Sequence, residues 1–458
     1  MNDHISEVRS ALENYLRDTN ISLSNFATIS GINSGSLSRI MNDTRPMSMR
    51  ELDKITATMG LPEDYFFNAY VDVCLFQFKV TWRRIKPFLY RCADLDRIDC
   101  IMKIVNNILD ELNYVPMLFD VAEDFFNDKK YPAAKVIYEG ISASEKFQHS
   151  ERLALCQYRL FHISLSEDLD SNYRAATVFE GYVDRLELND RLGAIVKLAH
   201  VFGPLGRWNK VDMLAQNLYR IAKIQYELEL KNSYLRQKRS RPAYYYILYS
   251  YLMRATVAEE YGQFNKALLY VSSYEDTDWI EEDTAEAKRI SSQFKEWAHV
   301  NRLLYRLKSG ELQVLPEYIN WIADKDREIP LAILTILSVA NHYQTNIDYV
   351  LSRFSEYITY RKLPHFSDSI LLERHARILI ELGIYYLRNK PEMGIKTILQ
   401  GLEFSLRCNN DKNIIRCMAI FEQNRGLSNS DEENKYKYLV NEVKILHEKN
   451  NHYFSFIV

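Results

Sequence analysis

Little in this 458-residue chain interrupts regular structure or points to a membrane. Only 14 glycines and 11 prolines occur, and alternating runs rich in Val and Thr are few. A run of about 18 apolar residues, which a membrane-spanning helix needs, is absent. The N-terminal stretch MNDHISEVRS carries neither the apolar segment nor the cleavage site of a signal peptide. These absences predict helix nearly throughout and a cytoplasmic protein without a membrane partner.

Signals for catalysis or for a bound metal are also missing. The six cysteines form no C-x-x-C pair, which predicts buried free thiols of a cytosolic protein. The motifs G-x-x-x-x-G-K-[ST], G-x-G-x-x-G, H-E-x-x-H and G-x-S-x-G do not occur. His365 and His375 lie ten residues apart, a spacing that matches no common metal site. The sequence therefore predicts no enzyme activity, no cofactor and no metal site.

The chain as a whole has no excess of basic charge. The formal net charge is −3, so any contact with nucleic acid must come from a local patch. Residues 1–70 hold six basic and nine acidic residues. Residues 34–50, in contrast, hold three arginines and a single acid, Asp43. The basic residues therefore concentrate in one short segment of the N-terminal region.

Two short helices joined by a tight turn are predicted around this segment. Ser22 is a good N-cap for the first helix, and Asn33 is a good N-cap for the second, over residues 34–41. Ala27 is small enough for the two helices to approach closely, and Gly31 can take the left-handed conformation that turns the chain. A further helix is expected from Ser48 onward.

The helix over residues 34–41 is expected to have one buried and one exposed face. Leu37, Ile40 and Met41 have the spacing of a core-facing stripe. The opposite face then carries Ser34, Gly35, Ser38 and Arg39. Short residues allow this face to approach a DNA groove, and an arginine can reach a base edge or a phosphate.

The same stretch resembles the Xre/Cro/lambda-repressor family of helix-turn-helix proteins. The resemblance rests on Leu23, Ala27, Gly31, Ile32, Leu37, Ser38, Arg39, Ile40, Pro46, Leu52, Ile55, Met59 and Leu61. It implies a DNA-binding domain over residues 1–70 and a double-stranded DNA operator as partner. The family's base-reading positions fall on Ser34, Gly35 and Arg39, and its phosphate-contacting Asn falls on Asn42. We predict DNA contacts at Asn33, Ser34, Gly35, Ser38, Arg39, Asn42, Thr44 and Arg45.

Two positions depart from the family pattern. Leu23 stands where the family often has a Gln that touches phosphate. Asp43 stands where a Gly usually follows the recognition helix; it can adopt the left-handed conformation but adds negative charge. The alternative interpretation of residues 1–70 is a helical bundle that has kept the fold and lost DNA binding, or that binds protein.

From residue 71 onward the sequence alternates helices with short polar breaks. Four of the breaks combine aromatic residues with a polar loop, at 125–134, 206–211, 261–268 and 385–391. The third resembles the tetratricopeptide repeat signature, in which Gly turns the chain, an aromatic fills a gap and Ala lets the second helix pack closely. The breaks are irregularly spaced. We therefore expect a degenerate tetratricopeptide-like α-solenoid over residues 71–458, within an all-α protein.

A basic segment in this body is followed directly by tyrosines. Residues 231–241 contain five basic residues and no acid, and five tyrosines follow between positions 244 and 251. One interpretation is a solvated loop and a packed helix. A second is a ligand-facing surface, with cations for a carboxylate and phenols for hydrogen bonds and stacking. A third is an auxiliary contact to phosphate.

A Cro-type head followed by a long helical-repeat body resembles the RRNPP family of peptide-pheromone receptors. The resemblance implies a homodimer of quorum-sensing type whose repeats bind a short imported peptide, with Asn side chains on inner helix faces holding the peptide backbone. Candidate asparagines are Asn217, Asn301, Asn320 and Asn341. The predicted peptide-binding set is Asn217, Arg239, Tyr245, Tyr249, Asn301 and Asn341. The dimer contact is open, with residues 414–446 as one candidate.

Three functions remain open at this point. The first is a transcriptional regulator that responds to a peptide. The second is a DNA-binding regulator whose repeats bind another protein. The third is an interaction scaffold with no operator. The operator sequence, the peptide and the sign of the response do not follow from the sequence.

Overall fold

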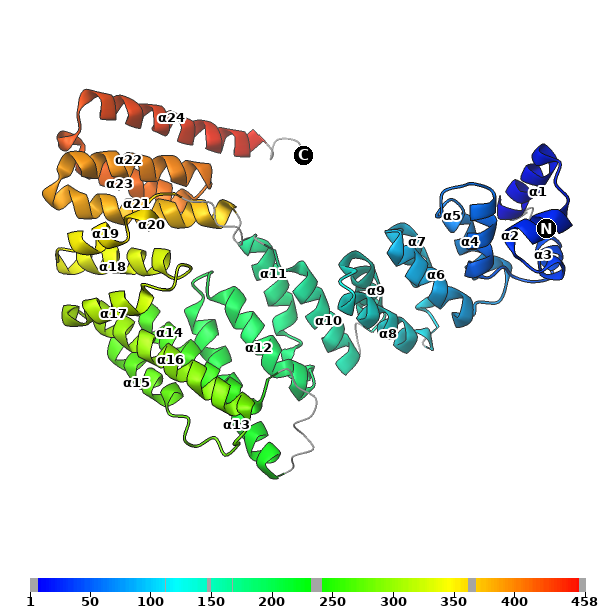
Figure 1. Ribbon diagram of the computed structural model, residues 1–458, viewed down its shortest axis with the longest axis horizontal. Coiled ribbons are helices and arrows are strands. Elements are labelled where there is room, and N and C mark those ends of the chain that lie inside the picture. Colours follow the sequence, from blue (N-terminus) through cyan, green and yellow to red (C-terminus); the bar gives the residue numbers. More distant parts are fainter. Residues whose placement is uncertain are drawn as a thin grey trace. The chain divides into compact units, whose positions relative to one another are not determined.

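The protein is helical throughout the residues that the computed structural model describes, which are 7–111, 113–145, 150–166, 168–231, 241–360 and 368–452. No strand occurs within these ranges, and the predicted all-α class is confirmed. Figure 1 shows the helices in chain order. The chain divides into two compact units, Met1–Tyr246 and Ile247–Val458. Each unit is described below by itself.

Of the first five helices, the second, third and fourth begin at a side-chain N-cap, formed by Ser22, Asn33 and Ser48. The Ser22 Oγ accepts a hydrogen bond from the Asn25 N–H, and the Asn33 Oδ1 accepts one from the Ser36 N–H. These side-chain oxygens satisfy backbone N–H groups that the start of a helix leaves without an intrahelical acceptor. The helices are α1 (Glu7–Thr19), α2 (Leu23–Ser30), α3 (Ser34–Met41), α4 (Met49–Thr58) and α5 (Phe67–Asp72).

The core of these five helices continues into the next pair, α6 (Trp82–Asp94) and α7 (Ile98–Ile108). The ring of Phe88 on α6 packs edge-on against both Phe67 and Tyr70 on α5. Residue 70, where we placed the end of the N-terminal domain, therefore lies inside α5 and within a shared core. A short π-helix, Val73–Gln77, joins α5 to the following segment.

The rest of the first unit is a run of helices in which each packs against its neighbour in sequence. The predicted breaks at 125–134 and 206–211 both lie between helices, and Gly206 turns the chain with φ 66°. The helices are α8 (Tyr114–Asn127), α9 (Tyr131–Ser144), α10 (Glu151–Ser164), α11 (Leu169–Glu180), α12 (Leu188–Phe202) and α13 (Trp208–Lys231), with a 3-10 turn at Val183–Arg185.

The second unit starts within α14 (Ala243–Glu260). The breaks at 261–268 and 385–391 again separate helices, as predicted. The remaining helices are α15 (Phe264–Glu275), α16 (Ala285–Lys308), α17 (Leu315–Ile322), α18 (Ile329–Tyr343), α19 (Asp348–Arg353), α20 (Ser355–Ile358), α21 (Asp368–Asn389), α22 (Pro391–Arg407), α23 (Asp411–Gln423) and α24 (Ser430–His452), with 3-10 turns at Leu312–Val314 and Arg425–Leu427.

In the second unit, α21 and α22 pack closely against each other. Glycines permit this approach, because a Cβ at Gly394 would lie 2.7 Å from the backbone nitrogen of Leu387. In Figure 1 the orange and red helices α21 to α24 lie beside one another, and α22 packs against α21, α23 and α24.

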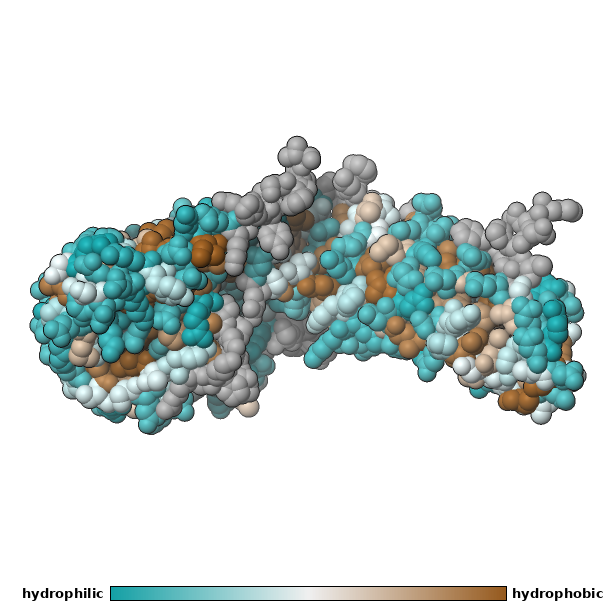
Figure 2. All heavy atoms as spheres, turned by 90° about the horizontal axis from the view of Figure 1, so that it is seen from above, coloured by the Kyte–Doolittle hydropathy of each residue, from teal (hydrophilic) through white to brown (hydrophobic). Residues whose placement is uncertain are grey.

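The surface is mainly hydrophilic where it can be seen. Figure 2 shows teal side chains over most of one face, with brown apolar residues in scattered groups. Among the helices described, none combines the length and the apolar character needed to cross a membrane.

Candidate functional site

Helix α3 presents a polar face to solvent, as its apolar spacing predicted. Leu37 is fully buried, and Ile40 and Met41 are also in the core. Ser34 and Arg39 are exposed on the opposite face. The other residues of the predicted DNA surface that are exposed are Asn33, Gly35, Asn42 and Thr44, while Ser38 and Arg45 are half-buried.

The turn that positions α3 is fixed by backbone geometry and by one distant side chain. Gly31 has φ 63°, the left-handed conformation expected of it. The Ile32 N–H donates to the Ala27 carbonyl at 3.0 Å, which closes the end of α2. The Lys54 ammonium on α4 donates to the Gly31 carbonyl. The orientation of α3 relative to α2 and α4 is thus determined by satisfied hydrogen bonds as well as by packing.

The polar side chains of α3 make only local contacts. The Arg39 Nε donates to the Gly35 carbonyl on its own helix at 3.2 Å. The Thr44 hydroxyl donates to the Arg39 carbonyl at 3.1 Å. Arg39 forms no ion pair with any of the described residues, so the remaining guanidinium donors face solvent. An exposed guanidinium with free donors suits contact with a base edge or a phosphate.

Arg45 is in a different situation from Arg39. Its guanidinium pairs with Glu51, whose carboxylate also accepts from the Ser48 N–H at 2.9 Å and from the Ser48 hydroxyl at 2.8 Å. Burial favours the neutral acid, but the Ser48 hydrogen bonds and the Arg45 pair outweigh it, so the pKa of Glu51 is lowered. A contact between Arg45 and DNA would have to share or break this pair.

The negative charge of Asp43 is neutralised by a residue that the sequence patterns did not single out. Asp43 has φ 51°, the left-handed conformation that was expected. The Arg9 Nη1 donates to the Asp43 Oδ2 at 2.8 Å, and the Arg9 Nε donates to Glu13 at 3.1 Å. No local pattern could have revealed the first pair, because 34 residues separate its members.

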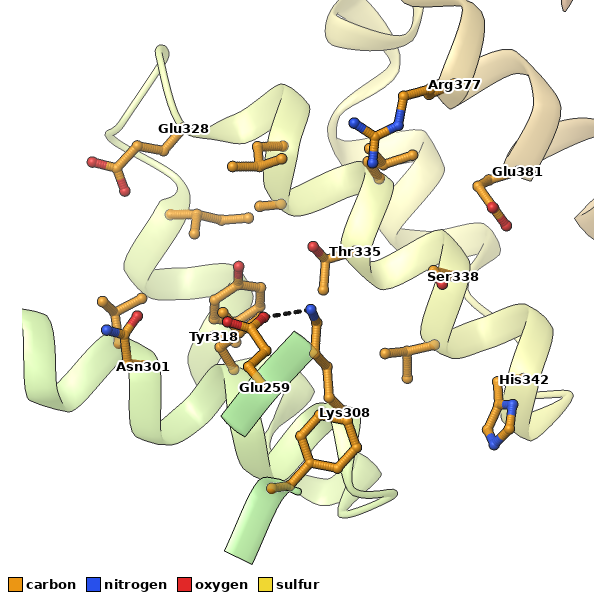
Figure 3. Close-up of a pocket in the computed structure, with 18 of the residues that line it drawn as sticks. Glu259, Asn301, Lys308, Tyr318, Glu328, Thr335, Ser338, His342, Arg377 and Glu381 are labelled. Atoms are coloured by element: carbon orange, nitrogen blue, oxygen red, sulfur yellow. Dashed lines mark hydrogen bonds and ion pairs between the residues drawn. The ribbon is translucent and has the colours of Figure 1, made fainter. Parts of the chain in front are cut away.

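A groove of about 830 Å³ forms a second candidate site, in the second unit. Figure 3 shows residues from several helices around it, with α18 running along its length. One face of α18 lines the groove with Leu331, Thr335, Ser338 and His342, spaced three or four residues apart. The apolar part of the lining includes Val300, Leu304, Tyr318, Trp321, Ile322 and Leu331.

The charged residues of the groove form two close ion pairs. The Lys308 Nζ lies 2.5 Å from the Glu259 Oε1, a pair drawn as a dashed line in Figure 3. The Arg416 Nη2 lies 2.6 Å from the Glu381 Oε1. The other Glu381 oxygen accepts from the Asn341 Nδ2 at 2.8 Å, so both oxygens of this carboxylate are used.

Two hydroxyl groups in the groove have no hydrogen-bond partner among the described residues. Serines and threonines elsewhere in these helices donate back to the preceding turn, as Thr397 does to the Met393 carbonyl and Ser405 to the Gly401 carbonyl. Thr335 and Ser338 make no such bond, nor any other to a described residue. Their hydroxyls are therefore available to a ligand or to water.

The structure places the predicted peptide-binding residues in both units. Asn301 lines the groove and donates from Nδ2 to the Tyr274 hydroxyl at 2.9 Å. The Asn341 Nδ2 donates to Glu381, while its Oδ1 is buried with no partner among the described atoms. Tyr249, on α14, also belongs to the second unit.

Neither Asn341 nor Tyr249 lines the groove, and the remaining members of the predicted set lie in the first unit or outside the described residues. Asn217 and Tyr245 belong to the first unit, where Asn217 accepts from Arg220 at 2.9 Å. The Arg241 guanidinium lies over the Tyr245 ring, 4.9 Å from its centre. Arg239 lies outside the described residues. Asn320, a further candidate, accepts from Arg353 at 2.9 Å and does not line the groove.

Five of the six cysteines and His375 are buried. All six cysteines are free thiols, and only Cys408 is not fully buried. Burial lowers the pKa of His375 to about 4, while His365 lies outside the described residues. Within the part of the chain that the structure describes, no three His, Cys, Asp or Glu side chains are grouped so as to hold a metal ion.

Comparison with models of known protein families gave no match, and comparison with curated proteins also gave none.

Proposed function

We propose that the chain is a sequence-specific DNA-binding transcriptional regulator whose helical body senses a short signalling peptide. The first five helices act as a Cro/lambda-repressor-like helix-turn-helix domain, and the later helices act as a degenerate tetratricopeptide-like solenoid. The observation that carries the proposal is the exposed face of α3. There Ser34, Gly35 and Arg39 point away from a core that holds Leu37 and Ile40.

The shape of this face supports contact with a major groove. At 1.5 Å per residue, α3 is about 12 Å long, and the major groove is about 12 Å wide. Short side chains at the start of α3 leave room for close approach, and Arg39 supplies the long donor. The Arg9–Asp43 pair removes the charge that would otherwise repel phosphate beside α3.

The groove of the second unit supports the sensing part of the proposal. The α18 face from Leu331 to His342 extends about 16 Å at 1.5 Å per residue. An extended chain covers that length with about five residues at 3.3 Å each. The apolar wall offers contact area for side chains, and the unpaired hydroxyls of Thr335 and Ser338 offer hydrogen bonds to a peptide backbone.

We propose further that the protein acts as a homodimer. Residues 1–70 are acidic overall, so one head is expected to bind DNA weakly. Two heads that read half-sites about 34 Å apart would multiply their affinities. A peptide that binds one arrangement of the heads better than another would then shift the dimer toward it.

The test is the selection of binding sites from a random-sequence DNA pool by the full chain, followed by footprinting. We expect enrichment of one sequence with two related half-sites, which is then protected at moderate salt. If no sequence is enriched and no protection is seen at low salt, the DNA-reading function is wrong and an interaction scaffold is favoured.

A further inference from the structure

The charges that line the groove are not balanced. Its three permanent cations are Lys308, Arg377 and Arg416. Each has a carboxylate partner: Lys308 pairs with Glu259 at 2.5 Å, Arg416 with Glu381 at 2.6 Å, and Arg377 with Glu373 at 3.8 Å. A ligand that brings a further anion would have to compete with these carboxylates.

Two exposed carboxylates of the groove, Glu260 and Glu328, form no ion pair with a described residue. Among the described residues, no Lys, Arg or His nitrogen lies within 4.0 Å of either, although both line the groove. Glu260 ends α14, and Glu328 precedes α18. Glu260 is exposed, yet partial desolvation by the groove wall, followed by repulsion from Glu259, raises its pKa. Lys308 and Arg377 stabilise its ionised form from a distance, but neither forms an ion pair with it, so the compensation is only partial.

On the premise that the proposed function is correct, we infer that the peptide is basic, with a cationic group held by Glu260 or Glu328. The apolar wall formed by Val300, Leu304 and Trp321 then holds a neighbouring hydrophobic side chain. A cation at either glutamate adds an ion pair and breaks none. An acidic peptide gains no such pair and meets four glutamates in the groove.

The length of α18 places these groups within reach of one peptide. Glu328 and His342 bracket the helix, and Thr335 and Ser338 lie between them. Figure 3 shows Glu328 near one end of the groove and His342 near the other. A peptide of about five extended residues can therefore place a cation at Glu328 while its backbone passes the two hydroxyls.

The test uses three pools of hexapeptides with acetylated and amidated ends, so that only side chains carry charge. One internal position is fixed as Arg, as citrulline or as Glu, and the other positions vary over the same set of neutral residues. The full chain selects from each pool, and retained peptides are quantified by mass spectrometry. Citrulline has nearly the shape of Arg without its charge, so the comparison isolates the ion pair.

Matched variants test which glutamate binds the cationic side chain of the peptide. Glu260→Gln combined with Glu328→Gln removes both unpaired charges, and each substitution is also made alone. Glu286→Gln removes the same charge from an exposed position of α16 outside the groove. We expect the Arg pool to be retained about 3- to 10-fold better than the citrulline pool. We expect the double variant to lose this preference and Glu286→Gln to keep it.

The outcomes separate the inference from the proposed function. Retention of all pools to the same extent overturns the basic-peptide inference and leaves peptide sensing intact. An Arg preference that survives the double variant overturns the assignment to Glu260 and Glu328. If no peptide is retained from any pool, both the inference and the peptide-sensing function are wrong.

Discussion

The guanidinium of Arg9 on α1 donates to the carboxylate of Asp43, just beyond the end of α3, at 2.8 Å. The pair joins the first helix to the edge of the proposed DNA-binding surface. It also compensates the Asp43 carboxylate, which without Arg9 would carry an unpaired negative charge beside the phosphates of a bound DNA. In the proposed DNA-binding function, Arg9 would therefore act electrostatically and indirectly.

Substitution of Arg9 should weaken operator binding through Asp43. We expect Arg9→Ala to reduce affinity about 2- to 5-fold, in line with the strength of an exposed charge pair. Asp43→Asn in the same chain should restore most of the loss, because no charge is then left unpaired. Fluorescence anisotropy with labelled operator measures both variants. Arg17→Ala, which removes a charge from the same helix without touching Asp43, is the control, and an equal loss there would contradict the prediction.

Arg39 should contribute directly to sequence recognition. Arg39→Ala is expected to cost about 1–3 kcal/mol on the specific site, because its free guanidinium donors are lost. The fold should be unaffected, since Arg39 is exposed and bonds only to its own helix. Operator affinity and circular dichroism check the two expectations. An unchanged affinity with an intact fold would show that α3 is not the reading helix.

Local features of the N-terminal region could be predicted from the sequence, because capping and turns depend on residues a few positions apart. Ser22 and Asn33 cap α2 and α3 as expected, and Gly31 takes the left-handed conformation. The Arg9–Asp43 pair could not be predicted, because its geometry depends on how α1 packs against the end of α3.

The residues that line the groove could be predicted only in part, because they too depend on how helices pack. Asn301 was singled out and does line it, but Asn320 and Asn217 were chosen by the same reasoning and do not. Sequence periodicity identifies helices, yet it does not tell which face meets a neighbouring helix. Glu260 and Glu328 were missed because unpaired surface glutamates are common, and only the pairing of the surrounding cations makes these two distinctive.

The cap of α4 should make the N-terminal region sensitive to acid. Hydrogen bonds from Ser48 and the pair with Arg45 hold the pKa of Glu51 below its ordinary value of 4.5. The ionised carboxylate therefore stabilises the folded state above that pH, and this contribution is lost as the pH falls through the lowered folded-state pKa. Glu51→Gln should remove the dependence and reduce stability at neutral pH by about 1–2 kcal/mol.

Hydrogen exchange of peptides from α4 measures this effect without requiring the whole chain to unfold in one step. We expect protection of α4 to fall between neutral pH and pH values below 4.5 in the wild type, after correction for intrinsic exchange. The Glu51→Gln variant should show low protection at both. Equal pH dependence in the two proteins would mean that another group is responsible.

The contact between α21 and α22 should tolerate no side chain at Gly394. A Cβ there would lie 2.7 Å from the Leu387 nitrogen and 2.9 Å from its Cα, and backbone atoms cannot move aside as a flexible side chain can. Gly394→Ala should therefore destabilise the second unit by about 1–3 kcal/mol, the usual range for an overpacked core. Gly426→Ala is the matched control, because nothing lies within 4 Å of its added Cβ. Urea unfolding followed by circular dichroism should show a lower midpoint only for Gly394→Ala, and an unchanged midpoint would mean that the two helices can separate without cost.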